Sequence, residues 1–215
     1  MLADNNIAVV PLGGKLKLIN LGPEELTVPF VISATGRIWM DRNLGASQVA
    51  TAVDDALAYG DLYQWGRAAD GHEKRTSGTT TTLSSTENPG HSKLSDISPY
   101  DWTSPQNNNL WQGVSGINNP CPDGFRLPSK DEWQAEVAAY GSTFEDLFDS
   151  PLQLPAAGSR HHNFAQLNAA DHEGAYWANT LENNNAFAVV FGAIPTSALS
   201  LFRAYGCSVR CIMDN

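Results

Sequence analysis

The chain has few basic residues and few charges of any kind. Its 215 residues include 13 Lys and Arg against 23 Asp and Glu, a formal net charge of −10, and only 17% of residues are charged. A surface with this excess of negative charge repels phosphate backbones and anionic lipid headgroups. We therefore expect no nucleic-acid partner, and proteins, neutral glycans and cationic surfaces remain as candidate ligands.

The chain also lacks a long apolar run. No stretch is long enough to span a bilayer, which predicts no membrane insertion. The first residues, MLADNNIAVVPLGGK, contain neither the basic segment nor the apolar core of a signal peptide. These absences fit a cytoplasmic protein or a virion protein released by lysis, and the Thr- and Asn-rich composition favours the virion. A bacterial cell surface is the alternative location.

Cysteine is scarce, with three residues in the chain, so at most one intrachain disulfide bond can form. Cys207 and Cys211 lie in a β-like run, CSVRCI. Four residues along a strand separate two side chains by roughly 13 Å, which is too far for a bond between them. Each of the two could approach Cys121 instead. Alternatively, all three are small buried apolar side chains, as free cysteines often are.

Sequence motifs of common catalytic and metal sites are absent. The chain has no nucleophile elbow, no glycine-rich phosphate loop and no zinc-binding motif. Three histidines match no established metal-site spacing, and four carboxylates could form a calcium or glycosidase-like cluster that spacing alone does not show. These residues are His161, His162 and His172, and Asp54, Asp55, Asp70 and Glu73. We therefore expect no enzymatic activity, no cofactor and no required metal.

The strongest local signal is the stretch 119–141, NPCPDGFRLPSKDEWQAEVAAYG. Ser129 is a candidate helix N-cap, and Glu132 can bond back to the Ser129 amide to complete a capping box. Gly141 supplies a left-handed stop. The apolar residues at helical spacing are Trp133, Val137 and Tyr140. The stretch therefore predicts a short capped helix that docks through Trp133.

The first 33 residues are a candidate β arm. Short apolar runs separated by glycine-rich turns predict strands at 7–10, 15–19 and 26–32. The arm could attach the protein to other virion proteins or make a contact within a homo-oligomer, or it could be an extra β layer on the same domain. We expect one domain over residues 34–215. Within it, near-helical apolar spacing in 48–68 predicts a helix interrupted at Gly60.

From residue 70 to 119 the chain is polar and has the composition of a long surface loop. Aromatic side chains in such loops suit sugar stacking or protein recognition, because they supply rigid contact area at low entropic cost. Alternatively, they pin the loop to the core. We expect this loop and the C-terminal loops around 183–185 and 197–205 to form one recognition surface. The candidate ligand-binding residues are Tyr100, Trp102, Asn107, Asn108, Trp111, Asn183, Asn184 and Tyr205.

The segment CPDGFRLPSKDEW, at 121–133, resembles the CPxGWxLPxxxEW signature of the Fibrobacter succinogenes major paralogous domain family, and also the RLPTxxEWE helix of formylglycine-generating-enzyme-like proteins. Further segments resemble the first family in the expected order: GRIWMDRNLG (36–45), YGDLYQWGRA (59–68), AYWAN (175–179) and SVRCI (208–212). The resemblance implies an α+β, C-type lectin-like fold of twisted antiparallel sheets with one or two helices and long loops. It implies structural roles for Trp39, Arg126, Ser129, Glu132, Trp133, Trp177 and Arg210, and a Cys121–Cys211 disulfide bond.

Departures from these families argue against catalysis. The chemistry of the formylglycine-generating relatives uses a pair of cysteines that holds copper, and Cys207 and Cys211 do not have that spacing. The lectin calcium signatures Glu-Pro-Asn and Trp-Asn-Asp are both missing. We therefore expect a non-catalytic recognition or adhesion module on a phage virion, receptor-binding or fibre-associated, or on a bacterial surface. Its expected ligand is a host-surface glycan or protein.

Two alternatives stay open. The first is a structural or decoration virion protein without a ligand, and the second is an enzyme related to the formylglycine-generating family. A receptor-binding module should expose Trp102, Trp111 or Tyr205 in a concave patch, whereas a structural protein should bury all three side chains.

Overall fold

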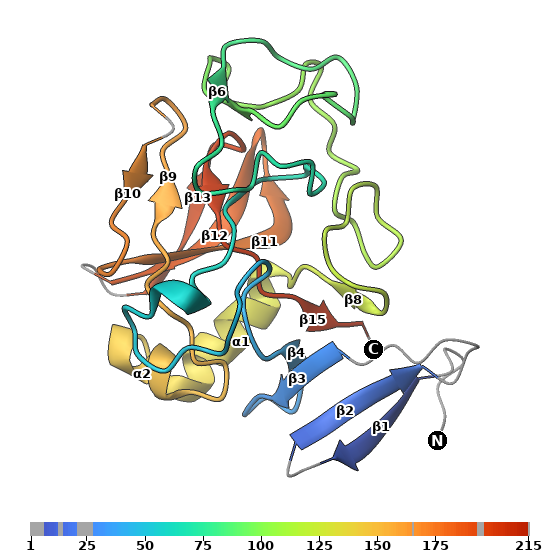
Figure 1. Ribbon diagram of the computed structural model, residues 1–215, viewed down its shortest axis with the longest axis vertical. Coiled ribbons are helices and arrows are strands. Elements are labelled where there is room, and N and C mark those ends of the chain that lie inside the picture. The colour runs from blue at the N-terminus through green and yellow to red at the C-terminus, as the bar shows by residue number, and fades with distance from the viewer. Residues whose placement is uncertain (1–6, 13–14, 21–27, 165, 193–195, 215) are drawn as a thin grey trace.

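The computed structural model describes residues 7–12, 15–20, 28–164, 166–192 and 196–214 (Figure 1). The fold is α+β, with short strands in several antiparallel sheets and two α-helices. The strands are β1 (Ile7–Leu12), β2 (Lys15–Asn20), β3 (Val28–Ile32), β4 (Ile38–Met40), β5 (Tyr63–Gln64), β6 (Thr79–Thr80), β7 (Leu94–Ser95), β8 (Phe125–Arg126), β9 (Ser159–Arg160), β10 (Leu167–Asn168), β11 (Gly174–Glu182), β12 (Asn185–Phe191), β13 (Ser197–Leu201), β14 (Gly206–Cys207) and β15 (Ile212–Met213). The helices are α1 (Lys130–Tyr140), α2 (Phe144–Asp149) and the single 3₁₀ turn η1 (Ala56–Ala58).

The largest sheet has the strand order β1-β2-β3-β4-β15-β8. Two further antiparallel sheets have the orders β10-β9-β14-β5 and β11-β12-β13, and β6 pairs with β7 in parallel. The C-terminal strand β15 lies between β4 and β8, with Ile212 opposite both Trp39 and Arg126. The end of the chain therefore joins the first strands of the domain to the segment that leads into α1.

The N-terminal arm continues the largest sheet. β2 pairs with β3 and β3 pairs with β4, so the β1–β2 hairpin shares one ladder with the rest of the domain. Figure 1 shows this hairpin projecting from the end of the molecule opposite the loops around β6. Strands predicted at 7–10 and 15–19 are present; of the strand predicted at 26–32, residues 26 and 27 lie outside the described residues. The arm is therefore an extension of the domain's own sheet, with β1 as its outer edge.

The helix predicted over 48–68 is wrong. This segment holds only η1 and β5 as regular elements. Asp55 caps one short turn by accepting a hydrogen bond from the Leu57 amide (3.1 Å). Gly60 then takes φ +67°, and a Cβ there would lie 2.3 Å from the carbonyl oxygen of Leu44. The close approach to Leu44 leaves no room for a Cβ atom, so this position requires glycine. The left-handed conformation of Gly60 ends a helix.

All six tryptophans are buried, none more than 1% exposed. A buried indole needs a partner for its N–H, and each of the six has one. The acceptors are Glu136 Oε1 for Trp39 (3.3 Å), Ala178 O for Trp65 (2.9 Å), Trp65 O for Trp102 (2.7 Å), Asn118 O for Trp111 (2.8 Å), Trp177 O for Trp133 (3.1 Å) and Tyr63 O for Trp177 (2.7 Å). Three of the acceptors belong to β5 and β11, and the bonds from Trp102 and Trp111 tie the long loop that carries them.

The capping box predicted for α1 is confirmed. Ser129 accepts a hydrogen bond from the Glu132 amide (3.1 Å), and the Glu132 carboxylate accepts one from the Ser129 amide (2.8 Å). Arg126 on β8 holds the same carboxylate with two bonds of 2.8 Å. Trp133 is 1% exposed, and the helix ends at Gly141, which has φ +117°. Cap, ion pair and indole together fix the start of α1 against the sheets.

Arg210 is buried at 1% exposure just before β15. Its guanidinium donates to Asn43 Oδ1 (3.1 Å) and to the carbonyl oxygen of Leu152 (2.6 Å). Burial lowers the pKa of Arg210 to about 10, so the side chain is still a cation at neutral pH. Arg210 therefore joins the segment before β15 to the segments that hold Asn43 and Leu152.

The predicted disulfide bond is confirmed between Cys121 and Cys211, whose Cα atoms are 5.9 Å apart. It links the turn before β8 to the residue before β15, across 90 residues of sequence. Cys207 is a free thiol in the core. Of the three cysteines, only Cys207 therefore behaves as a small buried apolar side chain.

Candidate functional site

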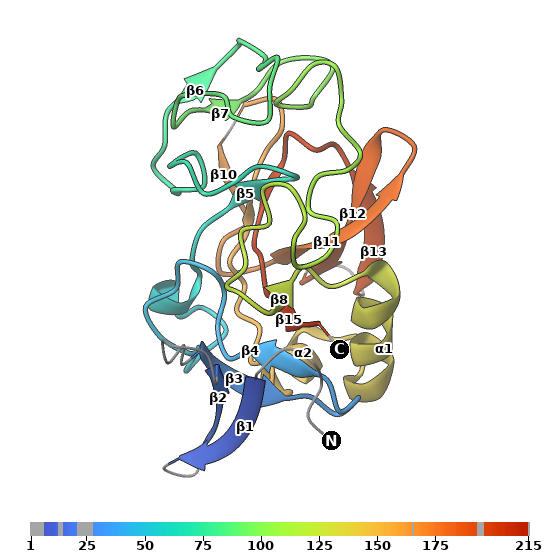
Figure 2. The same ribbon diagram turned by 90° about the vertical axis from the view of Figure 1, so that its right-hand side faces the viewer.

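The loop 70–119 covers the end of the molecule opposite the β1–β2 hairpin (Figures 1 and 2). Three of its aromatic residues, Tyr100, Trp102 and Trp111, were expected to contact a ligand, and this expectation is wrong for the two tryptophans. Trp102 is 1% exposed and Trp111 is 0% exposed. Their indole N–H groups bond to backbone carbonyls, and Trp111 packs on Trp65 with ring centroids 5.6 Å apart. They pin the loop to the core and are not available to a ligand.

The structure does bring the expected loops together. Arg203 donates to the carbonyl oxygen of Asn107 (3.1 Å) and to Oδ1 of Asn108 (2.5 Å). Gln106 donates to the carbonyl oxygen of Asn184 (3.2 Å), in the turn between β11 and β12. Asn108 and Asn184 are exposed, as is Asn183, and Asn107 is half-buried. The polar loop, the β11–β12 turn and the segment after β13 thus meet at one place.

Beside them lies a cluster of six rings that we call the aromatic cluster: Tyr100, His161, His162, Phe164, Phe202 and Tyr205. Ring centroids are 4.5 Å apart for Tyr100–His162, 5.0 Å for Tyr100–Phe202, 4.3 Å for His161–His162, 5.7 Å for His161–Phe164, 5.1 Å for His161–Tyr205, 4.9 Å for His162–Phe202 and 4.6 Å for His162–Tyr205. Only Tyr100 and Tyr205 were candidates from the sequence. The histidines were expected to be exposed turn residues without a role, and Phe164 and Phe202 were not singled out.

Three backbone segments position the aromatic cluster. The turn between β9 and β10 carries His161, His162 and Phe164, and the His161 amide donates to the carbonyl oxygen of Gln166 (3.0 Å). The connection from β13 to β14 carries Phe202 and Tyr205. The Ala204 amide in that connection donates to the carbonyl oxygen of Tyr100 (2.9 Å). Antiparallel pairing of β14 with β9 at Gly206 and Arg160 then fixes the last two segments side by side.

The aromatic cluster faces solvent over part of its area. Phe164 is 64% exposed and Phe202 is 39% exposed, while the two tyrosines and two histidines are half-buried. A hollow of about 220 Å³ adjoins it, lined by His161, Phe164, Gln166, Leu167 and Asn168. Burial, and then the neighbouring His161, lower the pKa of His162. At neutral pH His162 is therefore uncharged.

A buried ion pair lies beneath the aromatic cluster. Asp101 is 0% exposed and Arg203 is 1% exposed, with 3.9 Å between Asp101 Oδ2 and Arg203 Nη1. The guanidinium also lies 4.8 Å above the Trp65 ring, within the range of a cation–π contact. Burial raises the pKa of Asp101, although the nearby Arg203 opposes this. Both side chains are therefore shielded from solvent, and Arg203 is held by Asn107 and Asn108 as well.

Within the described residues, one group of side chains could offer metal ligands: Asp70, His72 and Glu73, whose candidate ligand atoms lie within 4.8 Å of one another. Each already has partners. His72 Nδ1 lies 2.8 Å from Asp70 Oδ1, and His72 Nε2 accepts from the Gln64 amide (3.0 Å). The Arg67 guanidinium donates to the other oxygen of Asp70 (2.7 Å). A metal would have to displace the Nδ1 proton beside an arginine cation, so the group fits a structural network at the base of the loop.

The pKa of Asp70 reflects this network. Burial alone would raise it, but hydrogen bonds from His72 and the charge of Arg67 lower it to about 2. Burial lowers the pKa of His72, although the bond to Asp70 opposes this. At neutral pH the histidine is therefore uncharged and donates its Nδ1 proton to a carboxylate.

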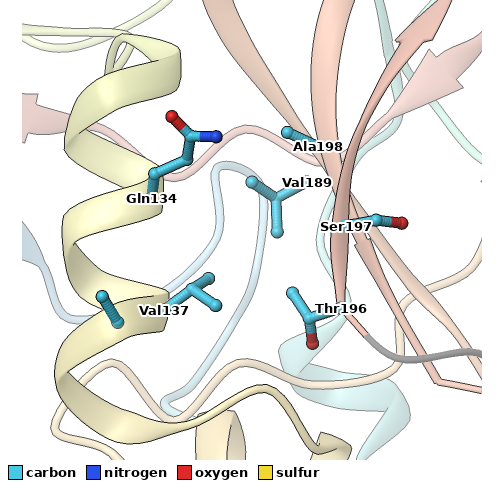
Figure 3. A pocket seen from close by; sticks show the side chains of 7 residues that line it. Gln134, Val137, Val189, Thr196, Ser197 and Ala198 are labelled. Atoms are coloured by element: carbon cyan, nitrogen blue, oxygen red, sulfur yellow. The ribbon is translucent and has the colours of Figure 1, made fainter.

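A second hollow, of about 280 Å³, lies between α1 and the strands β12 and β13 (Figure 3). Its lining residues are Gln134, Val137, Ala138, Val189, Thr196, Ser197 and Ala198. None of these side chains is ionisable near neutral pH, and the only hydroxyls are those of Thr196 and Ser197. The lining offers no general acid or base, so the hollow supports no reaction by itself.

No helix in the described ranges has both the length and the apolar character needed to cross a bilayer. No protein-family model, no curated protein and no solved structure matches the chain.

Proposed function

We propose that the protein is a non-catalytic recognition module, carried on a phage virion or on a bacterial surface, that binds a host-surface ligand through the aromatic cluster. The proposal includes membership of the Fibrobacter succinogenes major paralogous domain family and a C-type lectin-like topology. It rests on the sequence resemblance and on an α+β fold that carries the loops around β6 and β7 at the end opposite the β1–β2 hairpin.

The observation that carries the proposal is the aromatic cluster. Tyr100, Phe202 and Tyr205 come from loops that the sequence marks as recognition loops, and Phe164 adds the most exposed ring. Six rings drawn from three segments supply contact area with few rotatable bonds. The backbone bonds between the segments hold the rings in place before any ligand arrives, which reduces the entropic cost of binding.

A structural or decoration virion protein is the second candidate. The burial of Trp102 and Trp111 favours it, since a structural protein was expected to bury these side chains, and Tyr205 is half-buried. The outer edge of β1 is a further argument, because an edge strand offers unpaired backbone groups to a second chain. We propose that this edge of β1 contacts other virion proteins or a second copy of the chain.

The test is attachment of fluorescently labelled protein to a panel of bacterial strains. For a strain that binds, we expect Phe202→Ala and Phe164→Ala each to weaken attachment about tenfold, since each removes an exposed ring. Leu57→Ala is the matched control, because Leu57 is 61% exposed but lies on η1, outside the aromatic cluster. Unchanged attachment of both phenylalanine variants, or no attachment of the native protein to any strain, would favour the structural protein.

A further inference from the structure

We infer that the ligand of the aromatic cluster is an uncharged oligosaccharide; this inference rests on the proposed function. The first observation is the lack of exposed charge. The segments 97–109, 161–168 and 200–206, which supply the rings, contain only Asp101 and Arg203 among Asp, Glu, Lys and Arg. Both are at most 1% exposed and lie beside each other under the rings.

This lack of charge selects against several ligand classes. A phosphate, sulfate or uronic-acid group would need a cation at the site, and the one guanidinium within these three segments, that of Arg203, is buried against Trp65 and Asn108. An amine-bearing ligand would need a free, exposed carboxylate at the rings. Asp101 is covered, and the exposed Glu87 carboxylate already accepts a hydrogen bond from Asn107 (3.0 Å). Burying an unpaired charge is strongly unfavourable. The surface therefore suits a ligand without ionised groups, although the protein as a whole carries a net charge of −10.

The second observation is the chemistry that surrounds the rings. The hollow beside Phe164 and His161 is bordered by the amides of Gln166 and Asn168, and the exposed Asn163 lies in the same turn. A side-chain amide both donates and accepts hydrogen bonds, as a sugar hydroxyl does. The C–H face of a pyranose ring is apolar and can pack against an aromatic ring, while its hydroxyls point to the rim. Rings and amides in this arrangement match both parts of a sugar.

The hollow is small, which further favours a sugar over a folded protein. A stable protein interface buries on the order of 1,600 Å² in total and draws on a polar rim that includes charged groups. The residues that line the hollow offer the side-chain amides of Gln166 and Asn168 instead. One or two sugar units of a longer chain can occupy the hollow while the next unit lies across Phe202 and Tyr205.

The experiment uses the full chain on an array of neutral, acidic and amine-bearing oligosaccharides, together with periodate-treated cells of a strain that binds. We expect binding to neutral glycans that changes less than twofold between about 0.05 and about 0.5 M NaCl. We also expect attachment to fall after periodate oxidation. Phe164→Ala should weaken glycan binding about tenfold, and Phe164→Trp, which keeps a ring, should restore it.

Each other outcome overturns the inference. Cells that bind equally after periodate would identify a protein ligand, which refutes the sugar but leaves the recognition function intact. Preference for acidic or amine-bearing glycans, with binding lost at high salt, would refute the neutral ligand alone. Absence of attachment to any strain and any glycan would overturn the recognition function, and the inference with it.

Discussion

Removal of the Trp133 side chain tests the claim that the capped helix anchors the fold. Trp133 is 1% exposed, its ring centroid lies 4.8 Å from that of Trp39 and 5.8 Å from that of Tyr176, and its indole donates to the Trp177 carbonyl oxygen (3.1 Å). Trp133→Ala therefore opens a cavity between α1 and the sheets and removes a buried hydrogen bond. We expect a loss of about 3–5 kcal/mol in the free energy of unfolding.

A second substitution separates the contribution of the cavity from that of the hydrogen bond. Trp133→Phe keeps an aromatic ring against Trp39 and removes the indole N–H, so we expect a smaller loss of about 1–2 kcal/mol. Gln134→Ala, at the next and exposed position of α1, is the matched control and should stay within about 0.5 kcal/mol of the native protein.

The assay is urea denaturation followed by tryptophan fluorescence and by far-UV circular dichroism, with thermal melting as a check. For a chain of this size, the Trp133→Ala loss corresponds to a drop in Tm of roughly 6–20 °C. A native-like midpoint for Trp133→Ala would refute the reasoning. So would equal losses for the Ala and Phe variants, since the cavity would then contribute nothing.

Four further predictions concern stability, thiol reactivity and loop packing. Cys121→Ser should lower the free energy of unfolding by about 4–5 kcal/mol in the chain-entropy model, and peptide mapping should recover a Cys121–Cys211 bridge. In the same material Cys207 should resist alkylation until the protein unfolds, because burial raises its thiol pKa. The pKa of His72 is lower in the folded than in the unfolded state, so the unfolded chain binds more protons below about pH 6.5. The free energy of unfolding should therefore be greatest above that pH and fall as the pH drops, with a shallower fall in His72→Gln. Trp102→Phe should lower stability by about 1–3 kcal/mol yet leave cell attachment unchanged, because the ring is in the core; reduced attachment in a folded variant would contradict its placement.

Local sequence signals predicted α1 well. The residues of its capping box lie within three positions of each other, so their hydrogen bonds form without help from distant segments. The same reasoning was wrong for 48–68, where apolar spacing suggested a helix. There the approach of Gly60 to the backbone of Leu44, a contact between separate segments, decides the conformation.

Burial of the loop tryptophans could not be predicted from composition. Trp102 lies among polar residues, and its environment is set by the carbonyl oxygen of Trp65, 37 positions away. The aromatic cluster depends on longer connections still. Tyr100, His161 and Phe202 are brought together by the pairing of β14 with β9 and by the hydrogen bond from the Ala204 amide to the Tyr100 carbonyl oxygen. The apolar spacing within a single segment therefore does not predict these contacts between rings.

Hydroxyl-radical footprinting of the protein bound to cells of a recognised strain tests the central claim most directly. Oxidation of Tyr100, Phe164, Phe202 and Tyr205 should fall on binding, while Leu57, which is exposed outside the aromatic cluster, should be oxidised equally in the free and bound protein. Protection confined to residues of the β1–β2 hairpin, with the four rings oxidised as in the free protein, would contradict recognition through the aromatic cluster.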